Sequence, residues 1–136
     1  MSVDFSVGTK VISLGRIVNP VVPILVKTRS GYVPFDFLID TGADCSMIPA
    51  SIAETELGVS LARASQDTFF GIEGSGLQVY RGWASLKIGP YPLRVRCVFS
   101  PHEHSPLILG RMDVFRHFSI TFDNRLHRIR FTKLTR

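Results

Sequence analysis

Asp40 is the residue whose position most clearly suggests chemistry. It follows the apolar run Phe37-Leu38-Ile39 and precedes Thr41 and Gly42. A carboxylate at the end of a buried strand is costly, because its charged form loses hydration. Gly42 allows a sharp turn and a close approach by another chain, and the Thr41 hydroxyl can bond backbone in such a turn. The segment therefore fits either an Asx-type turn or a carboxylate held in place for acid–base chemistry.

Short apolar segments separated by Gly and Pro surround Asp40, and their alternation is typical of strands. The pattern predicts strands over residues 11–18, 21–27, 33–39, 68–70, 77–88, 93–99, 106–110, 118–122 and 129–131, with strand signals resuming at Leu61. Pro49 and Gly58 bracket a short helix, and residues 111–116 fit a second one. The fold class is therefore all-β, a barrel or sandwich with one or two short helices.

Composition narrows the class of protein further. The 136 residues, 45% of them hydrophobic, fit one globular domain over residues 1–136, and the net charge is +5. Two cysteines, Cys45 and Cys97, make no disulfide framework, so a reducing compartment is expected. The N-terminus has no signal-peptide pattern, and no apolar stretch is long enough to cross a membrane. A cytoplasmic protein without a membrane segment is the expectation.

Residues 37–43 resemble the active-site motif of retroviral-type, or retropepsin-like, aspartic proteases: apolar residues followed by Asp-Thr-Gly-Ala. Two later segments match that family in the expected order. Residues 70–76 (Phe-Gly-Ile-Glu-Gly-Ser-Gly) resemble its flap hairpin, and residues 107–111 (Leu-Ile-Leu-Gly-Arg) resemble the apolar run that ends in Gly-Arg. The resemblance covers roughly residues 21–122. It implies a closed, barrel-like retropepsin fold with a flap, assembled as a dimer.

The resemblance also implies an activity, that of an aspartic endopeptidase acting on a peptide or protein substrate without a cofactor or metal. Peptide hydrolysis needs a base to activate water and an acid to protonate the carbonyl oxygen. Two carboxylates that share one proton do both. Because the chain contains Asp-Thr-Gly once, a homodimer with one catalytic Asp40 from each subunit is expected.

Further roles follow from the resemblance, residue by residue. Thr41 would bond across the dimer and, with Gly42 and Ala43, support the active-site loops. Gly42 and Asp44 would bind substrate backbone, and Asp44, partly buried, would pair with Arg111. The flap residues Gly71, Ile72, Glu73 and Gly74 would close over the substrate. Met47, Ile48, Ile72 and Leu107 are candidates for pocket walls, with core packing equally compatible with each.

Several features depart from the family pattern or allow another function. Cys45 is best interpreted as a small buried residue. Met112-Asp113 follows Arg111, where the family often has an acidic residue directly after the Arg. A hairpin over residues 118–131 extends the C-terminus. A noncatalytic dimerisation or peptide-binding module is the alternative function. A basic nucleic-acid-binding domain is a third, not favoured because its Lys and Arg fit the polar face of an edge strand. The segment His102-Glu103-His104 gives no clear metal-ligand set.

Overall fold

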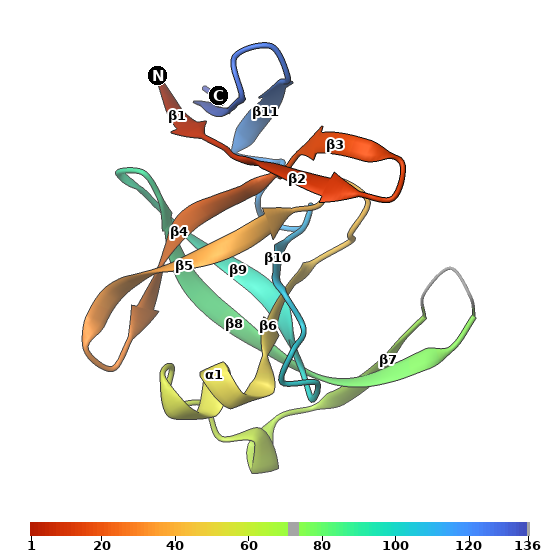
Figure 1. Ribbon diagram of the computed structural model, residues 1–136. Helices are drawn as coiled ribbons and strands as arrows, with labels where there is room; N and C mark the ends of the chain where they lie inside the picture. The colour runs from red at the N-terminus through yellow and green to blue at the C-terminus, as the bar shows by residue number, and fades with distance from the viewer. Residues whose placement is uncertain (71–73, 136) are drawn as a thin grey trace.

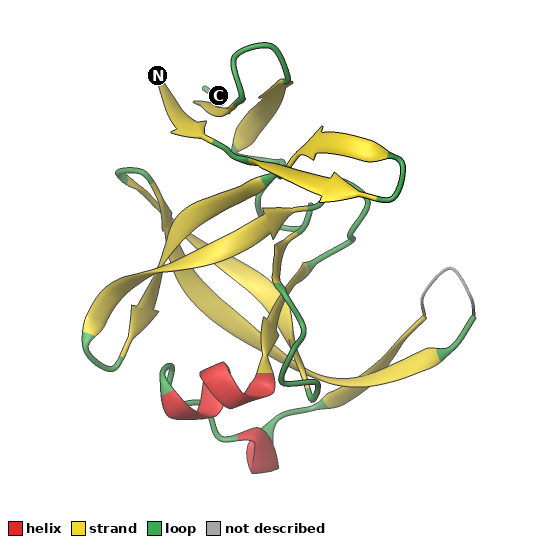
Figure 2. Cartoon of the chain, in the orientation of Figure 1, coloured by secondary structure: helices red, strands yellow, loops and turns green. Residues whose placement is uncertain are grey.

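The computed structural model describes residues 1–70 and 74–135, which fold mainly into strands (Figures 1 and 2). The all-β prediction is confirmed. The elements in chain order are β1 (Ser2–Ser6), β2 (Thr9–Ile12), β3 (Gly15–Val18), β4 (Val21–Thr28), β5 (Gly31–Ile39), β6 (Ser46–Pro49), α1 (Ala50–Thr55), the 3-10 helix η1 (Leu61–Arg63), β7 (Gln66–Phe70), β8 (Gly76–Ile88), β9 (Tyr91–Ser100), β10 (Leu107–Leu109), β11 (Phe118–Asp123) and β12 (Arg128–Lys133).

A closed barrel forms the centre of the molecule. Its sheet has the strand order β4-β5-β10-β6-β9-β8-β7, and β4 also pairs with β8 through Val26 and Leu86. This additional pairing closes six strands into a ring and leaves β7 outside it. The expected barrel is therefore confirmed, and the β7–β8 hairpin extends away from it (Figure 1).

Alternating apolar residues fill the barrel. On β4, Val22, Ile24 and Val26 are buried, whereas Pro23 and Lys27 face solvent, the period expected of a strand with one buried face. Phe37 and Phe99 are fully buried in the same core. Gly82 on β8 leaves room for Phe99, because a Cβ there would lie 2.4 Å from the ring.

The order of three strands brings distant segments of the chain together. β10 lies between β5 and β6, parallel to β5 with Leu109 opposite Ile39, and antiparallel to β6 with Ile108 opposite Met47. The chain segments after β5 and after β10 consequently leave the barrel at the same edge. These are the loops that contain Asp40 and Arg111.

A second sheet, in the order β1-β12-β11, packs beside the barrel. Phe5 and Phe118 each make an edge-to-face contact with Phe131, with ring centroids 5.7 and 5.9 Å apart. Asp4 on β1 pairs with Arg130 on β12, which joins the two ends of the chain. The strand β1 was not foreseen from the sequence.

The strand predicted over residues 11–18 is wrong in its extent. The segment forms a hairpin, β2–β3, in which Ile12 is opposite Gly15, and Gly15 has the positive φ (139°) that closes the turn. The hairpin pairs with no other strand of the described residues. Most of its apolar side chains remain in solvent, with Val11 68% and Leu14 92% exposed, whereas Val18 packs against the core.

Two other local predictions need correction. Residues 111–116 form successive turns instead of a helix, because Asp113 has φ 64°, which interrupts a right-handed helix. The segment from Leu61 is a 3-10 helix, and the strand begins only at Gln66. The helix after Pro49 is confirmed as α1, with Pro49 as its N-cap. Among the described residues, no helix is long and apolar enough to cross a membrane.

Candidate active site

The loop after β5 fixes the backbone of Asp40. The Asp40 N–H donates to the Leu109 carbonyl at 3.1 Å, which ties the residue to β10. Its carboxylate Oδ1 accepts the Gly42 N–H at 3.0 Å, and its carbonyl accepts the Ala43 N–H at 3.2 Å. The segment is thus a closed Asx-type turn, as one sequence interpretation expected, yet the Asp40 side chain is only partly buried. A turn and a reactive carboxylate are compatible here.

The loop after β10 lies directly against this turn. The Arg111 N–H donates to the Ala43 carbonyl at 3.0 Å, and the Met112 N–H donates to the Asp44 carbonyl at 2.9 Å. The Gly110 N–H donates to the hydroxyl of the buried Ser46 at 3.1 Å. Backbone hydrogen bonds therefore hold the two loops as one unit.

An ion pair between Arg111 and Asp44 connects the side chains of these loops. The sequence resemblance implied this pair, but with a partly buried carboxylate. In the isolated chain, the Asp44 side chain is 84% exposed and the Arg111 side chain 49% exposed. Exposed pairs of this kind stabilise a fold only weakly.

A second ion pair, between Arg96 and Asp113, was not found from the sequence. The Asp113 carboxylate accepts hydrogen bonds from the backbone N–H, Nε and Nη2 of Arg96 at 2.8, 2.9 and 2.8 Å. The Asp113 side chain is 8% exposed. The hydrogen bonds from Arg96 lower the pKa of Asp113 to about 2. This bidentate contact ties the turns after Arg111 to β9.

Asp40 and Thr41 line a cavity with a volume of about 380 Å³. Its other walls include Pro20, Phe122 and Arg128. Thr41 and Gly42 are exposed beside Asp40. The surface therefore combines the Asp-Thr-Gly turn with residues from the end of β3 and from the β11–β12 hairpin. Nothing in the isolated chain adds a second carboxylate of the Asp-Thr-Gly type, since the sequence contains one such motif.

Comparison with known proteins identifies the family. A sequence profile described as "gag-polyprotein putative aspartyl protease" matches residues 26–117, which include both Asp40 and Arg111. The chain belongs to this family. A search of curated proteins finds no significant match.

Two solved structures resemble this retropepsin-like chain. A retropepsin-like aspartic protease from Rickettsia conorii has 15% identity and a TM-score of 0.65, over 96% of this chain and 91% of the other. EIAV protease in complex with the inhibitor HBY-793 has 21% identity and a TM-score of 0.52, over 68% of this chain and 82% of the other. At these identities the similarity supports the retropepsin fold alone.

The segment that the sequence resemblance predicted as a flap, residues 70–76, begins in β7 and ends in β8. These strands pair with Phe69 opposite Leu77 and Asp67 opposite Val79. Gly74 is exposed and has φ 84°, a conformation that favours glycine. The predicted substrate contacts of Gly71, Ile72 and Glu73 lie outside the described residues.

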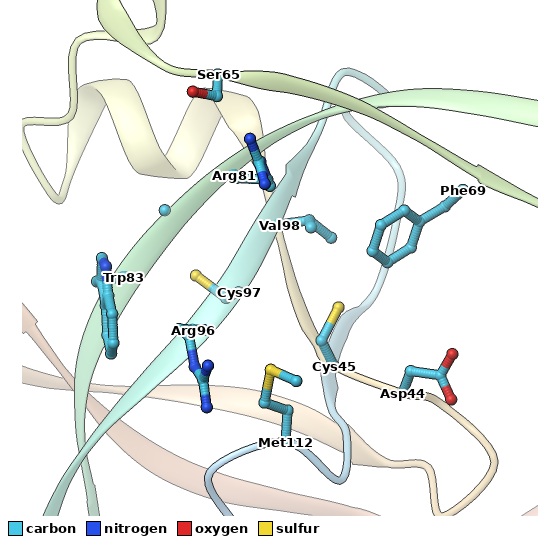
Figure 3. Close-up of a pocket in the computed structure, with 11 residues that line it drawn as sticks. Asp44, Cys45, Ser65, Phe69, Arg81, Trp83, Arg96, Cys97, Val98 and Met112 are labelled. Atoms are coloured by element: carbon cyan, nitrogen blue, oxygen red, sulfur yellow. The ribbon is translucent and has the colours of Figure 1, made fainter.

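A second cavity, of about 500 Å³, lies beside Asp44 and extends to strand β7 (Figure 3). Asp44 and Cys45, Phe69 of β7, Arg81 and Trp83 of β8, and Val98 of β9 line it with five neighbours. Arg81 and Trp83 were not assigned to a site from the sequence. Their positions on alternate residues of one strand were the available signal.

The apolar residues predicted as pocket walls lie elsewhere. Ile48 is fully buried in the core, and Met47 and Leu107 are partly buried without lining either cavity. Ile72 lies outside the described residues. For these described residues, core packing is the better interpretation.

The two cysteines are free thiols, Cys45 partly buried and Cys97 buried. Burial raises the pKa of Cys97 to about 12, and burial with the nearby Asp44 charge raises that of Cys45. Both thiols consequently stay protonated at neutral pH, which is consistent with packing instead of nucleophilic catalysis.

Proposed function

We propose that the chain is an aspartic endopeptidase that hydrolyses peptide bonds as a homodimer, with one Asp40 from each subunit. The observation that supports this most directly is the placement of Asp40. It lies in a family-matching Asp-Thr-Gly turn, held by β10 through Leu109 and left accessible on a concave surface. A fixed and accessible carboxylate is what general acid–base catalysis requires.

The chemistry requires a second carboxylate. In the proposed dimer, one Asp40 is ionised and removes a proton from a water molecule, which attacks the peptide carbonyl carbon. The partner subunit's Asp40 is protonated and donates its proton to the carbonyl oxygen. The tetrahedral intermediate then collapses as the C–N bond breaks: the amine nitrogen receives the proton that the first Asp40 took from water, and one hydroxyl returns its proton to the partner subunit's Asp40.

The surface around Asp40 supports association with a second copy. Thr41 and Gly42 are exposed there, beside Phe122, which is also exposed although apolar. The β2–β3 hairpin joins β4 through Asn19 and Pro20 at the edge of this surface, and it carries the exposed Val11 and Leu14. Apolar side chains left in solvent next to an incomplete site favour a dimer interface over a free surface.

Substrate would bind as an extended strand between the active-site loop and the flap. In this proposal the Gly42 carbonyl and Asp44 bind substrate backbone, and Gly71, Ile72, Glu73 and Gly74 cover it. The ion pair with Arg111 would orient the Asp44 carboxylate for that contact.

The test compares wild-type protein with Asp40→Asn on a mixed peptide library from acidic to neutral pH, at matched dimer content. Cleavage by wild type and none by the variant is expected, because an amide cannot act as the general base. Equal cleavage by both proteins would exclude Asp40 as the catalytic residue. Dimers that bind peptides without cleaving them would instead favour the noncatalytic peptide-binding module.

A further inference from the structure

The cavity next to Asp44 has two chemically different ends. Asp44 and Cys45 form the end that continues into the active-site loop. Figure 3 shows Arg81 toward the opposite end, with Val98 and Cys45 between it and Asp44. Its volume of about 500 Å³ is ample for the side chains of a bound peptide.

The charges of this cavity are unequally neutralised. Arg111 pairs with Asp44, and Asp113 pairs with Arg96. No carboxylate of the described residues lies within 4 Å of the Arg81 guanidinium. The Arg81 end therefore presents a cation without a carboxylate partner among those residues.

The surroundings of Arg81 favour a side chain that combines a carboxylate with an apolar stem. Phe69, Val98 and Met112 supply apolar wall, against which methylene groups can pack. Trp83 is held beside the cavity by Arg94, whose guanidinium lies 4.3 Å from the ring centroid, and by Arg96 at 5.9 Å.

We infer that this cavity is a specificity subsite for an acidic side chain of the substrate, glutamate in particular, with its carboxylate on Arg81. The inference rests on the proposed function for the path of the peptide, which would leave the active site past Asp44. A guanidinium that can bind a carboxylate through two nitrogens selects against the isosteric amide. The substrate class is thus a peptide with glutamate at an outer position, beyond the residues that flank the cleaved bond.

Trp83 allows a direct test, because it is the only tryptophan of the chain, it lines the cavity and it is 48% exposed. The experiment uses the full chain with Asp40→Asn, so that peptide is not consumed. Tryptophan fluorescence is followed while octapeptides with an apolar centre are added. The peptides differ only in carrying Glu, Gln or Lys at one outer position, scanned in turn.

At one position, the Glu peptide is expected to change Trp83 fluorescence and to bind about three- to tenfold more tightly than the Gln peptide, as for a charge-assisted contact at a partly exposed site. Adding Arg81→Glu should reverse the preference to Lys. Arg63→Glu makes the same change in net charge on η1, at an exposed residue that does not line the cavity, and should leave the preference for Glu intact. Circular dichroism confirms that each variant is folded.

The outcomes separate this inference from the proposed activity. Equal binding of Glu and Gln peptides at every position, or a Glu preference that Arg81→Glu leaves unchanged, would overturn the subsite. Glu-selective binding through Arg81, with no cleavage by the wild type, would sustain the subsite and reject the endopeptidase.

Discussion

Gly110 lies directly against the backbone of Cys45, so that a Cβ on Gly110 would be 2.3 Å from the Cys45 carbonyl oxygen. Neither backbone can move freely, because the neighbouring residues Arg111 and Ala43 are hydrogen-bonded to each other. The side-chain-free position is therefore what allows the two active-site loops to meet.

Gly110→Ala is expected to lower the free energy of unfolding by about 1–3 kcal/mol, the usual cost of overpacking, and to abolish peptide cleavage by separating the loops. Urea denaturation and a cleavage assay measure the two effects. Gly8→Ala is the matched control, since nothing lies within 4 Å of a Cβ there. Wild-type stability in the Gly110 variant would contradict the close contact.

The Arg96–Asp113 pair predicts a pH-dependent contribution to stability. The pKa of Asp113 is about 2 in the folded chain, below its ordinary 3.8. A lowered pKa stabilises the fold above the unfolded value, and this contribution is lost as pH falls from 3.8 through about 2. Asp113→Asn should lower the free energy of unfolding by about 1–2 kcal/mol at neutral pH and by little at pH 2. The cost is limited because the Arg96 side chain is half exposed, which weakens the ion pair.

Chemical denaturation at a series of pH values measures this difference. Asparagine tolerates the positive φ of residue 113, so the substitution reports on the charge. Asp36→Asn, exposed on β5, serves as the control. If the difference in unfolding free energy between wild type and Asp113→Asn stayed constant from pH 7 to pH 2, the charge of the Asp113 carboxylate would not be the cause of the stabilisation.

Arg111→Ala separates orientation from stability. Because the ion pair with Asp44 is exposed in the isolated chain, its loss should cost less than about 1 kcal/mol of unfolding free energy. The efficiency of cleavage should fall by more than this small loss of stability would explain, mainly through a higher KM, because Asp44 would no longer be held toward the substrate. Arg63→Ala on η1 is the comparison for an ordinary surface arginine. If KM matched that of the Arg63 variant, Arg111 would have no positioning role.

Leu14→Glu tests the proposed dimer surface. Leu14 is 92% exposed at the tip of the β2–β3 hairpin, so the change should leave the fold of each subunit intact. Burying the added charge against a second copy should weaken dimerisation at least about tenfold, or about 1.4 kcal/mol. Sedimentation at several concentrations measures it. Ala62→Glu adds the same charge to η1, far from the hairpin in Figure 1, and should leave the dimer unchanged.

The sequence alone determined most strands of the barrel, because burial on one face imposes a period of two that is readable locally. The alternation of β4 and β9 and the turns at Gly and Pro follow from this. The Asp40-Thr41-Gly42 turn was also predictable, since the carboxylate bonds a backbone N–H only two residues away. Local patterns were less reliable where one residue changes the backbone, as at Gly15 and Asp113.

The tertiary structure decided contacts between distant residues that the sequence did not indicate. β10 follows β5 by about seventy residues yet pairs directly with it. This strand order places Arg111 beside Asp44, a pair that the family resemblance had implied, and Asp113 beside Arg96, a pair that was not found from the sequence. The cavity with Arg81 and Trp83 also arises from strands separated in sequence. Side-chain partners of this kind depend on sheet order and register, which no local periodicity encodes.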